Sequence, residues 1–583
     1  MHNAPNTPGG RTVDVTVVDG HIVHEPLVAT DHYDEAVAKA NTARIRAIMT
    51  HPDAGEHTVF LFPSGAFYFD GAAEGAETTL ATTRRFQTIM GVDAGGTRLL
   101  QKSTDVAATV GLHHSTCALR NLYIGSADAD AVFHVNWEAH PHQAAILMEA
   151  PPVGNGQKWT VDAQISNVNI NSGGNTILIE HYNRPFRTGI AVRGPWLNIY
   201  AHTMWITDVF TAIHIDQGPT MAGPAKFIDV NFYSSHDREH SKAWSTFFKS
   251  ERHFMEQVEL IHCTFIGAQF IYMDGPLPEG EPGQPTPAFD MVIDHNYVNV
   301  YDTMDASEQL EPDARWSGIY MNLPGKKTPN GSILSTRDIR FTSNSCTGRA
   351  PIDGAFFYVE GMCRGITFAD NDISCAGADR CVYIRPTMAD TGVNTRAPIR
   401  DVDVSRNYFR TWWNPVTVGD AEGPLCVKRV IVAQNRNDYE GDLNHAARIG
   451  IDVRHAEQVI IEANALAETG GAGIAVQDAE EVVIQGNALR GLASDASGTG
   501  IALRNVQCAA VSGNTLSRWA RAIAVEESAA VSLQGNVLRN GALGMDLRDS
   551  SNLRVSGNVI VDTEEALREE GLQDSVVDPE TTR

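Results

Sequence analysis

Four stretches near the C-terminus decide the fold of this chain. They read GIAVQDAEEVVIQGNALRG (473–491), GIALRNVQCAAVSGNTLSRW (500–519), AIAVEESAAVSLQGNVLRNG (522–541) and GMDLRDSSNLRVSGNVIVDT (544–563). Each holds three short segments in which apolar residues alternate with other residues, and polar turns separate the segments. Such alternation is typical of β-strands with one buried face, and a repeated supersecondary unit is typical of a solenoid. The sequence therefore predicts a β-solenoid with three strands in each coil.

One asparagine recurs just before the third strand of the repeat. The set is Asn296, Asn344, Asn371, Asn407, Asn435, Asn464, Asn487, Asn514, Asn536 and Asn558. The closest spacing is 22 residues, which suits one solenoid turn, and the spacing stretches to 48 residues where loops are inserted. Asparagine tolerates left-handed backbone, and stacked amides can hydrogen-bond between coils. We interpret these residues as structural, and the irregular period disfavours a leucine-rich repeat.

The segment before the repeats predicts a cap. Residues 31–51 (DHYDEAVAKANTARIRAIMTH) begin with an Asp cap and carry apolar residues at roughly helical spacing, and the strand-like VFLFPSGAFYFDG (59–71) follows. We expect an N-terminal capping α-helix at this end of the solenoid.

Composition and charge exclude several function classes. The 583 residues carry a formal net charge of -26, which disfavours nucleic acid as a partner because such binders need clustered Lys and Arg. No apolar run reaches the ~18 residues that span a membrane, and the first residues lack a signal pattern. We expect a soluble protein, cytoplasmic by default, whose eight cysteines are mostly buried thiols.

The capping helix, the Pro-Ser-Gly strand and the asparagine turns resemble the pectin-lyase-like superfamily. The resemblance implies an all-β fold, a single right-handed parallel β-helix, and an enzyme acting on polysaccharide or oligosaccharide. Many relatives are trimers, so a homotrimer is a further expectation. The expected organisation is an N-terminal extension (1–30), the β-helix with its cap (31–565) and a polar tail (566–583).

Because side chains alternate between the two faces of a strand, the sequence predicts which residues of the central coils face outward. In the first strand of each coil the residues between apolar positions must point outward. The predicted outward pairs are His214 with Asp216, Phe247 with Lys249, Tyr272 with Asp274, Tyr320 with Asn322, Tyr358 with Glu360, and Tyr383 with Arg385. One column is mostly aromatic, which predicts a stacking strip for sugar rings. The alternative is that the aromatics only pack beneath the insertions at 275–288 and 302–316.

Carboxylates beside this strip suggest glycoside hydrolysis. Asp274 is the preferred catalytic residue, with Asp216 or Glu360 as its partner. We expect each pair to lie two coils, or ~9.6 Å, apart, with Lys249 or Asn322 between, near the ~6.5 to 9.5 Å of inverting glycosidases.

Three alternatives remain open. Polysaccharide elimination needs a base and a cation, which Lys249, Arg385 or His214 could supply. Inulin fructotransferases share a β-helix with asparagine turns, so intramolecular transfer is possible. A glycan-binding tailspike or adhesin would use the strip without turnover.

Two other sequence patterns indicate a functional site less strongly. The stretch 234–254 contains His236, His240 and His253, which could bind a divalent cation, although we expect no cofactor. Residues 293–296 (Ile-Asp-His-Asn) are similar to a pectate-lyase signature but run into the asparagine turn, so we interpret them as structural. The polygalacturonase motif set is absent.

Overall fold

The computed structural model describes most of the chain. The described residues are 10–72, 76–102, 106–127, 143–149, 160–172, 186–194, 196–216, 223–233, 245–251, 257–275, 289–300, 317–323, 325–327, 333–349, 355–376, 380–387, 396–410, 414–420, 425–438, 449–492 and 498–578.

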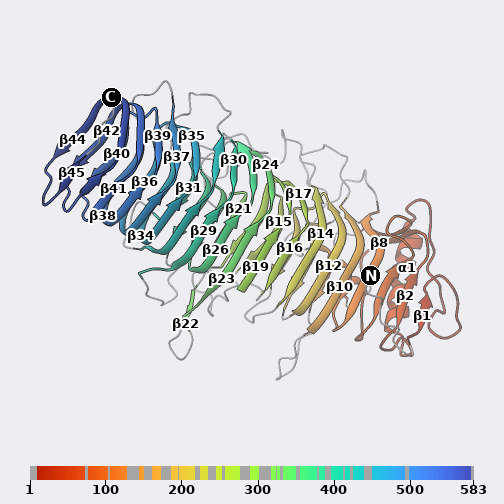
Figure 1. Cartoon of the computed structure of the whole chain (residues 1–583). Helices are drawn as coiled ribbons and strands as arrows, with labels where there is room; N and C mark the ends of the chain where they lie inside the picture. Colours follow the sequence, from red (N-terminus) through yellow and green to blue (C-terminus); the bar gives the residue numbers. More distant parts are fainter. Residues whose placement is uncertain are drawn as a thin grey trace. The chain divides into compact units, whose positions relative to one another are not determined.

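The chain divides into two compact units. Unit 1 comprises Met1–Ala288 with Thr303–Asp305, and unit 2 comprises Phe289–Asp302 with Ala306–Arg583. Within each unit, successive coils place three strands on three walls, and each strand pairs in parallel with its counterpart in the next coil (Figure 1). Parallel strands within one sheet are connected in a right-handed sense in nearly all proteins. The predicted right-handed parallel β-helix is confirmed.

In unit 1 the walls follow the order of strands in a coil. The first wall contains β4 (Thr78–Ala81), β7 (Ala108–Leu112), β9 (Ala144–Glu149), β11 (Thr188–Arg193), β13 (Thr211–Asp216), β15 (Thr246–Glu251) and β18 (Gln269–Asp274). The second contains β1 (Thr12–Asp14), β2 (Val59–Phe62), β5 (Thr88–Gly91) and β16 (Val258–Ile261). The third contains β3 (Gly65–Phe69), β6 (Thr97–Gln101) and β17 (Thr264–Gly267). Four strands bend from the second wall into the third: β8 (Cys117–Ser126), β10 (Thr160–Asn171), β12 (Trp196–Thr207) and β14 (Ala225–Tyr233).

Unit 2 repeats this arrangement. Its first wall contains β21 (Ile319–Leu323), β25 (Ala355–Gly361), β28 (Arg380–Pro386), β31 (Asn414–Val418) and β40 (Arg521–Glu526). Its second contains β19 (Phe289–Asp294), β23 (Ile333–Thr342), β26 (Cys363–Ala369), β29 (Ile399–Ser405), β32 (Val427–Ala433), β41 (Val531–Gln534), β43 (Arg554–Ser556) and β45 (Val576–Asp578). Its third contains β20 (Tyr297–Val300), β24 (Ser345–Arg349), β27 (Asp372–Ala376), β30 (Tyr408–Arg410), β33 (Arg436–Asp438), β35 (Ala465–Thr469), β37 (Ala488–Gly491) and β39 (Thr515–Ser517).

Several strands of unit 2 depart from the one-wall pattern. The strands that serve two walls are β34 (Ile449–Glu462), β36 (Ala472–Gln485), β38 (Thr499–Ser512), β42 (Val537–Arg548) and β44 (Val559–Glu570). The short β22 (Gly325–Lys327) pairs antiparallel with β23.

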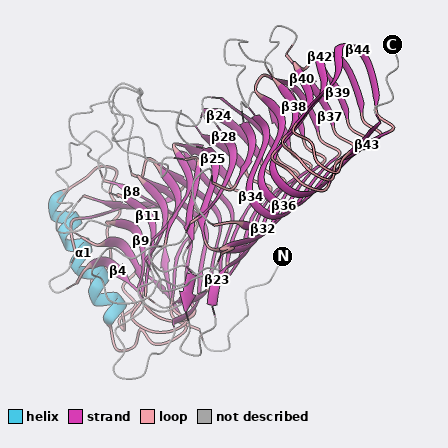
Figure 2. Cartoon of the chain, turned by 90° about the vertical axis from the view of Figure 1, so that its left-hand side faces the viewer, coloured by secondary structure: helices cyan, strands magenta, loops and turns pink. Residues whose placement is uncertain are grey.

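The capping helix is confirmed and starts later than predicted. Helix α1 spans Glu35–Thr50, because the carboxylate of Asp34, and not Asp31, accepts the N-cap hydrogen bond from the amide of Val37. Its buried face, which includes Ile45 and Ile48, lies against β3 and β4 of unit 1 (Figure 2). The helix thus covers apolar residues that the first coils would otherwise expose.

Parallel strands lie on both sides of the predicted β-helix boundaries. Strand β1 lies in the segment expected to be an N-terminal extension, and it pairs with β2. Strand β45 pairs with β43 inside the expected polar tail.

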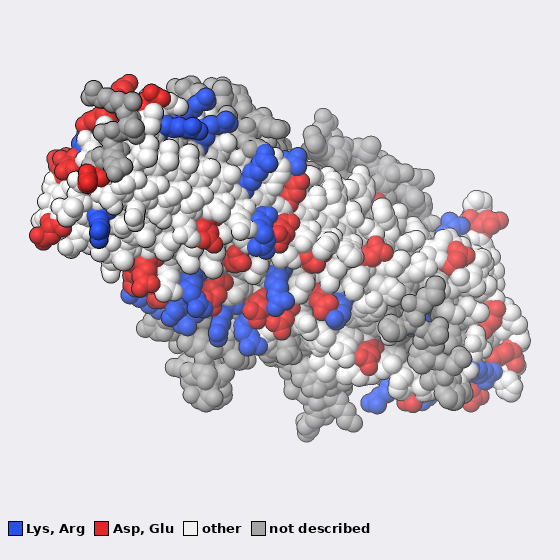
Figure 3. Space-filling model, viewed as in Figure 1, with Lys and Arg blue, Asp and Glu red and all other residues white. Residues whose placement is uncertain are grey.

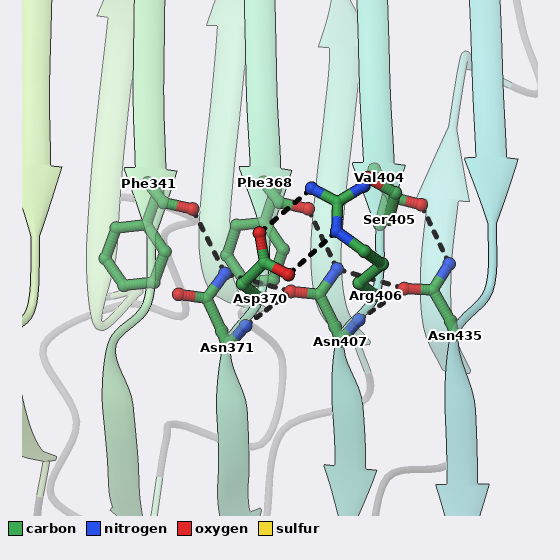
Figure 4. Close-up of polar contacts among 9 residues, drawn as sticks. All are labelled: Phe341, Phe368, Asp370, Asn371, Val404, Ser405, Arg406, Asn407 and Asn435. Carbon is green, nitrogen blue, oxygen red and sulfur yellow. Dashed lines mark hydrogen bonds and ion pairs between the residues drawn. The ribbon is translucent and has the colours of Figure 1, made fainter.

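The asparagine ladder is confirmed in unit 2. All ten asparagines are at most 2% exposed, and each directly precedes a third-wall strand segment. Asn407 shows the repeated pattern: its Nδ2 donates to the backbone carbonyl of Phe368 at 2.8 Å and to Oδ1 of Asn435 at 3.0 Å (Figure 4). Its own Oδ1 accepts from Nδ2 and the backbone amide of Asn371. The Asn407 side chain therefore links three consecutive coils.

In unit 1, Cys263 holds the position directly before a third-wall strand. This thiol is 1% exposed and lies 3.5 Å from the backbone carbonyl of Phe227 on the preceding coil. Of the seven cysteines whose side chains are described, six are buried and all are free thiols. This agrees with the expectation of buried thiols.

Exposed charges of unit 2 are paired between coils. Arg406 donates to both carboxylate oxygens of Asp370 at 2.8 and 2.9 Å, and Arg410 donates to Asp372 at 2.9 Å. Along the lower middle of the face in Figure 3, Lys and Arg side chains likewise lie beside Asp and Glu. Such exposed pairs contribute little energy each.

Candidate functional site

The first wall of unit 1 presents two outward columns. Ile213, Phe248 and Ile271 point into the core in register, so the next residues in their strands point outward. The first outward column is His214, Lys249 and Tyr272. Glu251 is in register with Asp274 in the second column, and Asp216 ends β13 two residues after His214.

This register corrects one predicted pair. Phe247 is 0% exposed and its ring stacks on Phe270 at 5.3 Å, so it cannot offer a surface for sugar stacking. The outward pair of this coil is Lys249 with Glu251, two residues later than predicted. Two adjacent phenylalanines made the alternation ambiguous in the sequence, and the neighbouring coils resolve it by pairing with Phe248. Lys249 therefore does not lie between Asp216 and Asp274 in the second column.

Glu251 was not predicted as a site residue. A signal was available, because His214-x-Asp216, Lys249-x-Glu251 and Tyr272-x-Asp274 share one spacing and all end in an acid. The side chain of Asp216 lies outside the described part of the structure.

Two basic side chains hold the Glu251 carboxylate. Its Oε2 lies 3.2 Å from Nζ of Lys249 and 3.4 Å from Nε2 of His214. Burial raises the pKa of Glu251, but the hydrogen bond from His214 and the charge of Lys249 outweigh it and lower that pKa to about 2. Glu251 is therefore ionised at neutral pH. Its side chain is 36% exposed, so a ligand can reach it.

The neighbouring coil supplies a phenol and a second carboxylate. The hydroxyl of Tyr272 donates to Oδ2 of Asp274 at 3.2 Å, and Nζ of Lys249 lies 5.6 Å from the centre of the Tyr272 ring. Both Tyr272 and Asp274 are half-buried. The arrangement brings two carboxylates, a phenol and two basic groups together on adjacent strands.

The first wall of unit 2 carries the other predicted residues. Tyr320, Tyr358 and Tyr383 form one column in register. Asn322, Glu360 and Arg385 form the next. The rings of Tyr358 and Tyr383 stack at 4.8 Å with an interplanar angle of 7°. The predicted register is therefore correct in this unit.

Burial changes the interpretation of two of these tyrosines. Tyr320 and Tyr358 are each 2% exposed, so the expectation that their rings form an open stacking strip is wrong. Their hydroxyls donate to the two carboxylate oxygens of Glu360 at 2.7 and 2.9 Å. Burial, followed by the charge of Glu360, raises the pKa of Tyr358, so this phenol stays protonated. Tyr383 is half-buried and keeps part of its ring accessible.

An alternating row of charges continues beside these rings. Arg385 donates from Nε to Asp420 at 2.7 Å and lies 4.0 Å from Glu360. Burial lowers the pKa of Arg385, but hydrogen bonds with Tyr358 and Asp420 outweigh it and raise that pKa. In a further coil Arg454 pairs with Asp452 at 2.9 Å. Arg385 is thus a paired cation in this structure, and Asp420, its main partner, was not predicted.

The terminal coils and the 293–296 tetrad complete the description of the walls. The terminal coils present Ala475 with Gln477 and Ala502 with Arg504 in register. Asn296 of the 293–296 tetrad belongs to the asparagine ladder, which confirms a structural role for it.

No metal site is found among described side chains. No group of three or more His, Cys, Asp or Glu in the described residues could hold a metal ion. The histidines considered for a cation, His236, His240 and His253, lie outside that part of the chain.

One family model matches the C-terminal coils. The model described as "Right handed beta helix region" covers residues 449–573, which lie entirely within unit 2. The match agrees with the observed strand pattern and names no reaction.

Solved structures with β-helix similarity include three proteins described as carbohydrate enzymes. The A-module of the mannuronan C-5 epimerase AlgE6 from Azotobacter vinelandii is 12% identical, with 95% of this chain and 98% of that chain covered and a TM-score of 0.21. A mutant of DFA-IIIase from Arthrobacter chlorophenolicus A6, in complex with DFA-III, is 10% identical, with 77% of this chain and 95% of that chain covered and a TM-score of 0.37. The catalytic unit of a GH87 α-1,3-glucanase from Streptomyces thermodiastaticus strain HF3-3 is 8% identical, with 97% of this chain and 70% of that chain covered and a TM-score of 0.26. Similarity at this level carries no argument about the activity of this chain.

Two further comparisons gave negative findings. No curated protein matches the sequence. Among the described residues, no helix has the length and hydropathy required to cross a bilayer.

Proposed function

We propose that this chain is a carbohydrate-active enzyme that cleaves or transfers glycosidic bonds of an uncharged glycan. The pairing of Glu251 with Asp274 on adjacent strands of the first wall of unit 1 carries this proposal. Adjacent parallel strands lie ~4.8 Å apart, close to the ~5 to 5.5 Å between the carboxyls of retaining glycosidases. The sequence had instead paired Asp274 with a carboxylate two coils, or ~9.6 Å, away, as in an inverting enzyme.

Glu251 is suited to act as the nucleophile. Its pKa of about 2 keeps it ionised, and its partial exposure leaves room for an anomeric carbon to approach. In the first step its carboxylate bonds to that carbon as the glycosidic bond breaks, and the departing oxygen takes a proton from an acid.

Asp274 is assigned as the acid and base. It lies one coil from Glu251, and the hydroxyl of Tyr272 donates a hydrogen bond to it at 3.2 Å, which orients the carboxyl group. In the second step Asp274 accepts a proton from the attacking hydroxyl, and the bond to Glu251 breaks. Attack by water gives hydrolysis, whereas attack by a sugar hydroxyl gives transfer.

The charges favour an uncharged sugar. Lys249, the cation of the first column, lies 3.2 Å from Glu251 and is largely neutralised by it. A uronate would bring another carboxylate to a site that already contains Glu251 and Asp274, inside a chain of net charge -26. Elimination chemistry, which depends on neutralising that uronate carboxylate, is therefore the weaker interpretation.

The test compares substrates and variants. Inulin, dextran, alginate and polygalacturonate are incubated with the protein, and new reducing ends, product size and ultraviolet absorbance of unsaturated uronates are followed. We expect smaller products from an uncharged polymer without ultraviolet absorbance. Absorbance from alginate or polygalacturonate would instead indicate a lyase, and no change in any polymer would favour a glycan-binding role.

Variants then test the assigned residues. Glu251→Gln and Asp274→Asn should each reduce the turnover of the folded protein by at least about a thousandfold, because each removes a reacting group. Glu251→Gln should also melt at a lower temperature near neutral pH, since it loses the ion pairs with Lys249 and His214, so circular dichroism is used to show that the fold is retained. Glu526→Gln is the matched control, since Glu526 is an exposed acid in the corresponding column of a terminal coil of unit 2. Azide should restore bond cleavage in Glu251→Ala and form a glycosyl azide. Full activity in either isosteric variant would exclude that residue from the reaction.

A further inference from the structure

A different wall of unit 1 carries exposed aromatic side chains that the proposed reaction does not use. On the third wall, Asn169, Trp205, Asn231 and Thr264 occupy one outward column in register. Thr207 and Tyr233 lie in the neighbouring column, with Tyr233 one coil beyond Trp205. These six residues are named the third-wall strip.

The aromatic rings of the strip face solvent. Trp205 is 50% exposed and Tyr233 is 43% exposed, whereas Trp196 at the start of the same strand as Trp205 is 0% exposed. Ordering a large ring at the surface without burying it contributes little to folding, since apolar stabilisation scales with the area removed from water. The exposure of both rings is therefore better explained by a ligand than by the core.

Amides and hydroxyls surround the rings. Asn169 and Asn231 flank Trp205 on the two adjacent coils, so each lies ~4.8 Å from it along the wall. Their Nδ2 groups lie 3.5 Å from the backbone carbonyls of Ala94 and Met204, which is a weak contact. These amides can turn toward a ligand at small cost. An apolar ring flanked by amides matches the apolar face and equatorial hydroxyls of a pyranose.

The six residues of the strip include no Asp, Glu, Lys, Arg or His, although the chain as a whole carries a charge of -26. A polyanion would gain no ion pair within it, and a polycation would find no carboxylate. An uncharged polar ligand suits this surface best.

We propose that the third-wall strip is a binding site for an uncharged glycan chain, separate from Glu251 and Asp274. Trp205 and Tyr233 differ by one coil and two residues, so their backbones lie about 8 Å apart on the wall. Two rings at this separation can contact two sugar units of one chain. The strip would hold a polymer on the protein without taking part in its cleavage, and this inference stands whether or not the proposed reaction is correct.

Affinity electrophoresis through gels containing inulin, dextran or alginate tests the inference. All samples carry Asp274→Asn, so that slow cleavage cannot alter the gel. We expect retardation by inulin or dextran and none specific to alginate. Trp205→Ala should weaken that retardation about tenfold, which corresponds to the loss of one well-packed aromatic contact. Trp205→Phe should restore part of it.

Controls separate binding from folding and from association. Tyr200→Ala removes another exposed ring, from the second-wall part of β12, and should leave retardation unchanged. Circular dichroism should show equal folding in all variants, because Trp205 is half exposed. The inference is overturned if neither uncharged polymer retards the protein, or if Trp205→Ala matches its parent. It is also overturned if sedimentation shows that Trp205→Ala dissociates an oligomer, since the strip would then be a contact between copies of this chain.

Discussion

Replacing Asn407 by alanine tests the asparagine ladder that supports the coils of unit 2. Asn407 is 1% exposed and accepts hydrogen bonds from the backbone amide and the side chain of Asn371. It also donates to the backbone carbonyl of Phe368. After substitution, the amide of Asn371 and the carbonyl of Phe368 lose these partners in a buried setting. Each such loss costs ~1 to 3 kcal/mol, so we expect about 4 kcal/mol in total.

Hydrogen exchange measures this cost locally, which matters because a long solenoid need not unfold in one step. Peptides covering 366–376 should exchange about a thousandfold faster in Asn407→Ala, since ~1.4 kcal/mol corresponds to a factor of ten. Gln458→Ala is the control, because Gln458 is an exposed amide that also bonds between coils, to Glu481 at 3.0 Å. It should change exchange in its own peptides less than about threefold. If Asn407→Ala changes exchange no more than this control, the ladder does not stabilise the coils in the way argued.

Three further predictions concern the first wall. Glu251 has a pKa lowered from 4.5 to about 2, so its ion pairs contribute stability above about pH 4.5 that is lost as the pH falls through 2. The melting temperature should therefore fall more steeply over this pH range for the wild type than for Glu251→Gln. Parallel curves of melting temperature against pH would contradict the assigned contacts. Phe247→Ala should lower stability by ~3 to 5 kcal/mol because the ring is fully buried, while the turnover of the folded fraction stays within about twofold; lost turnover in a protein of normal stability would restore Phe247 as a ligand-binding residue. Tyr358→Phe should cost ~1.5 to 3 kcal/mol, because Glu360 loses a hydroxyl donor at 2.9 Å; a denaturation midpoint equal to that of the wild type would show that this hydrogen bond contributes nothing.

Much of the fold could be predicted because its causes are local. Each ladder asparagine sits directly before a strand, and alternation specifies which side of a strand is buried. The outward columns of unit 2 were also predictable, since Tyr358 and Glu360 alternate with the apolar residues Phe357 and Val359. The N-cap of α1, Asp34, was harder to predict, because Asp31 and Asp34 are both suitable N-caps and the sequence alone does not rank them.

The site was harder to predict because it depends on neighbours distant in sequence. Phe247 and Phe248 are both fully buried, and only the pairing of Phe248 with Ile213 and Ile271 shows that the outward column begins at Lys249. That pairing also introduced Glu251, which changed the expected carboxyl separation from two coils to one. The burial of Tyr320 and Tyr358 likewise had no local signal.

By itself the sequence determined the solenoid, its three-strand coil and the asparagine turns, because period and turn chemistry act over a few residues. Only the tertiary structure decided which carboxylates are neighbours, which aromatic rings remain exposed and which cations are already paired. These properties depend on the register and packing between coils 22 to 48 residues apart in the chain, and the inserted loops leave that register unmarked by any constant spacing, as the coil of Phe247 and Phe248 shows.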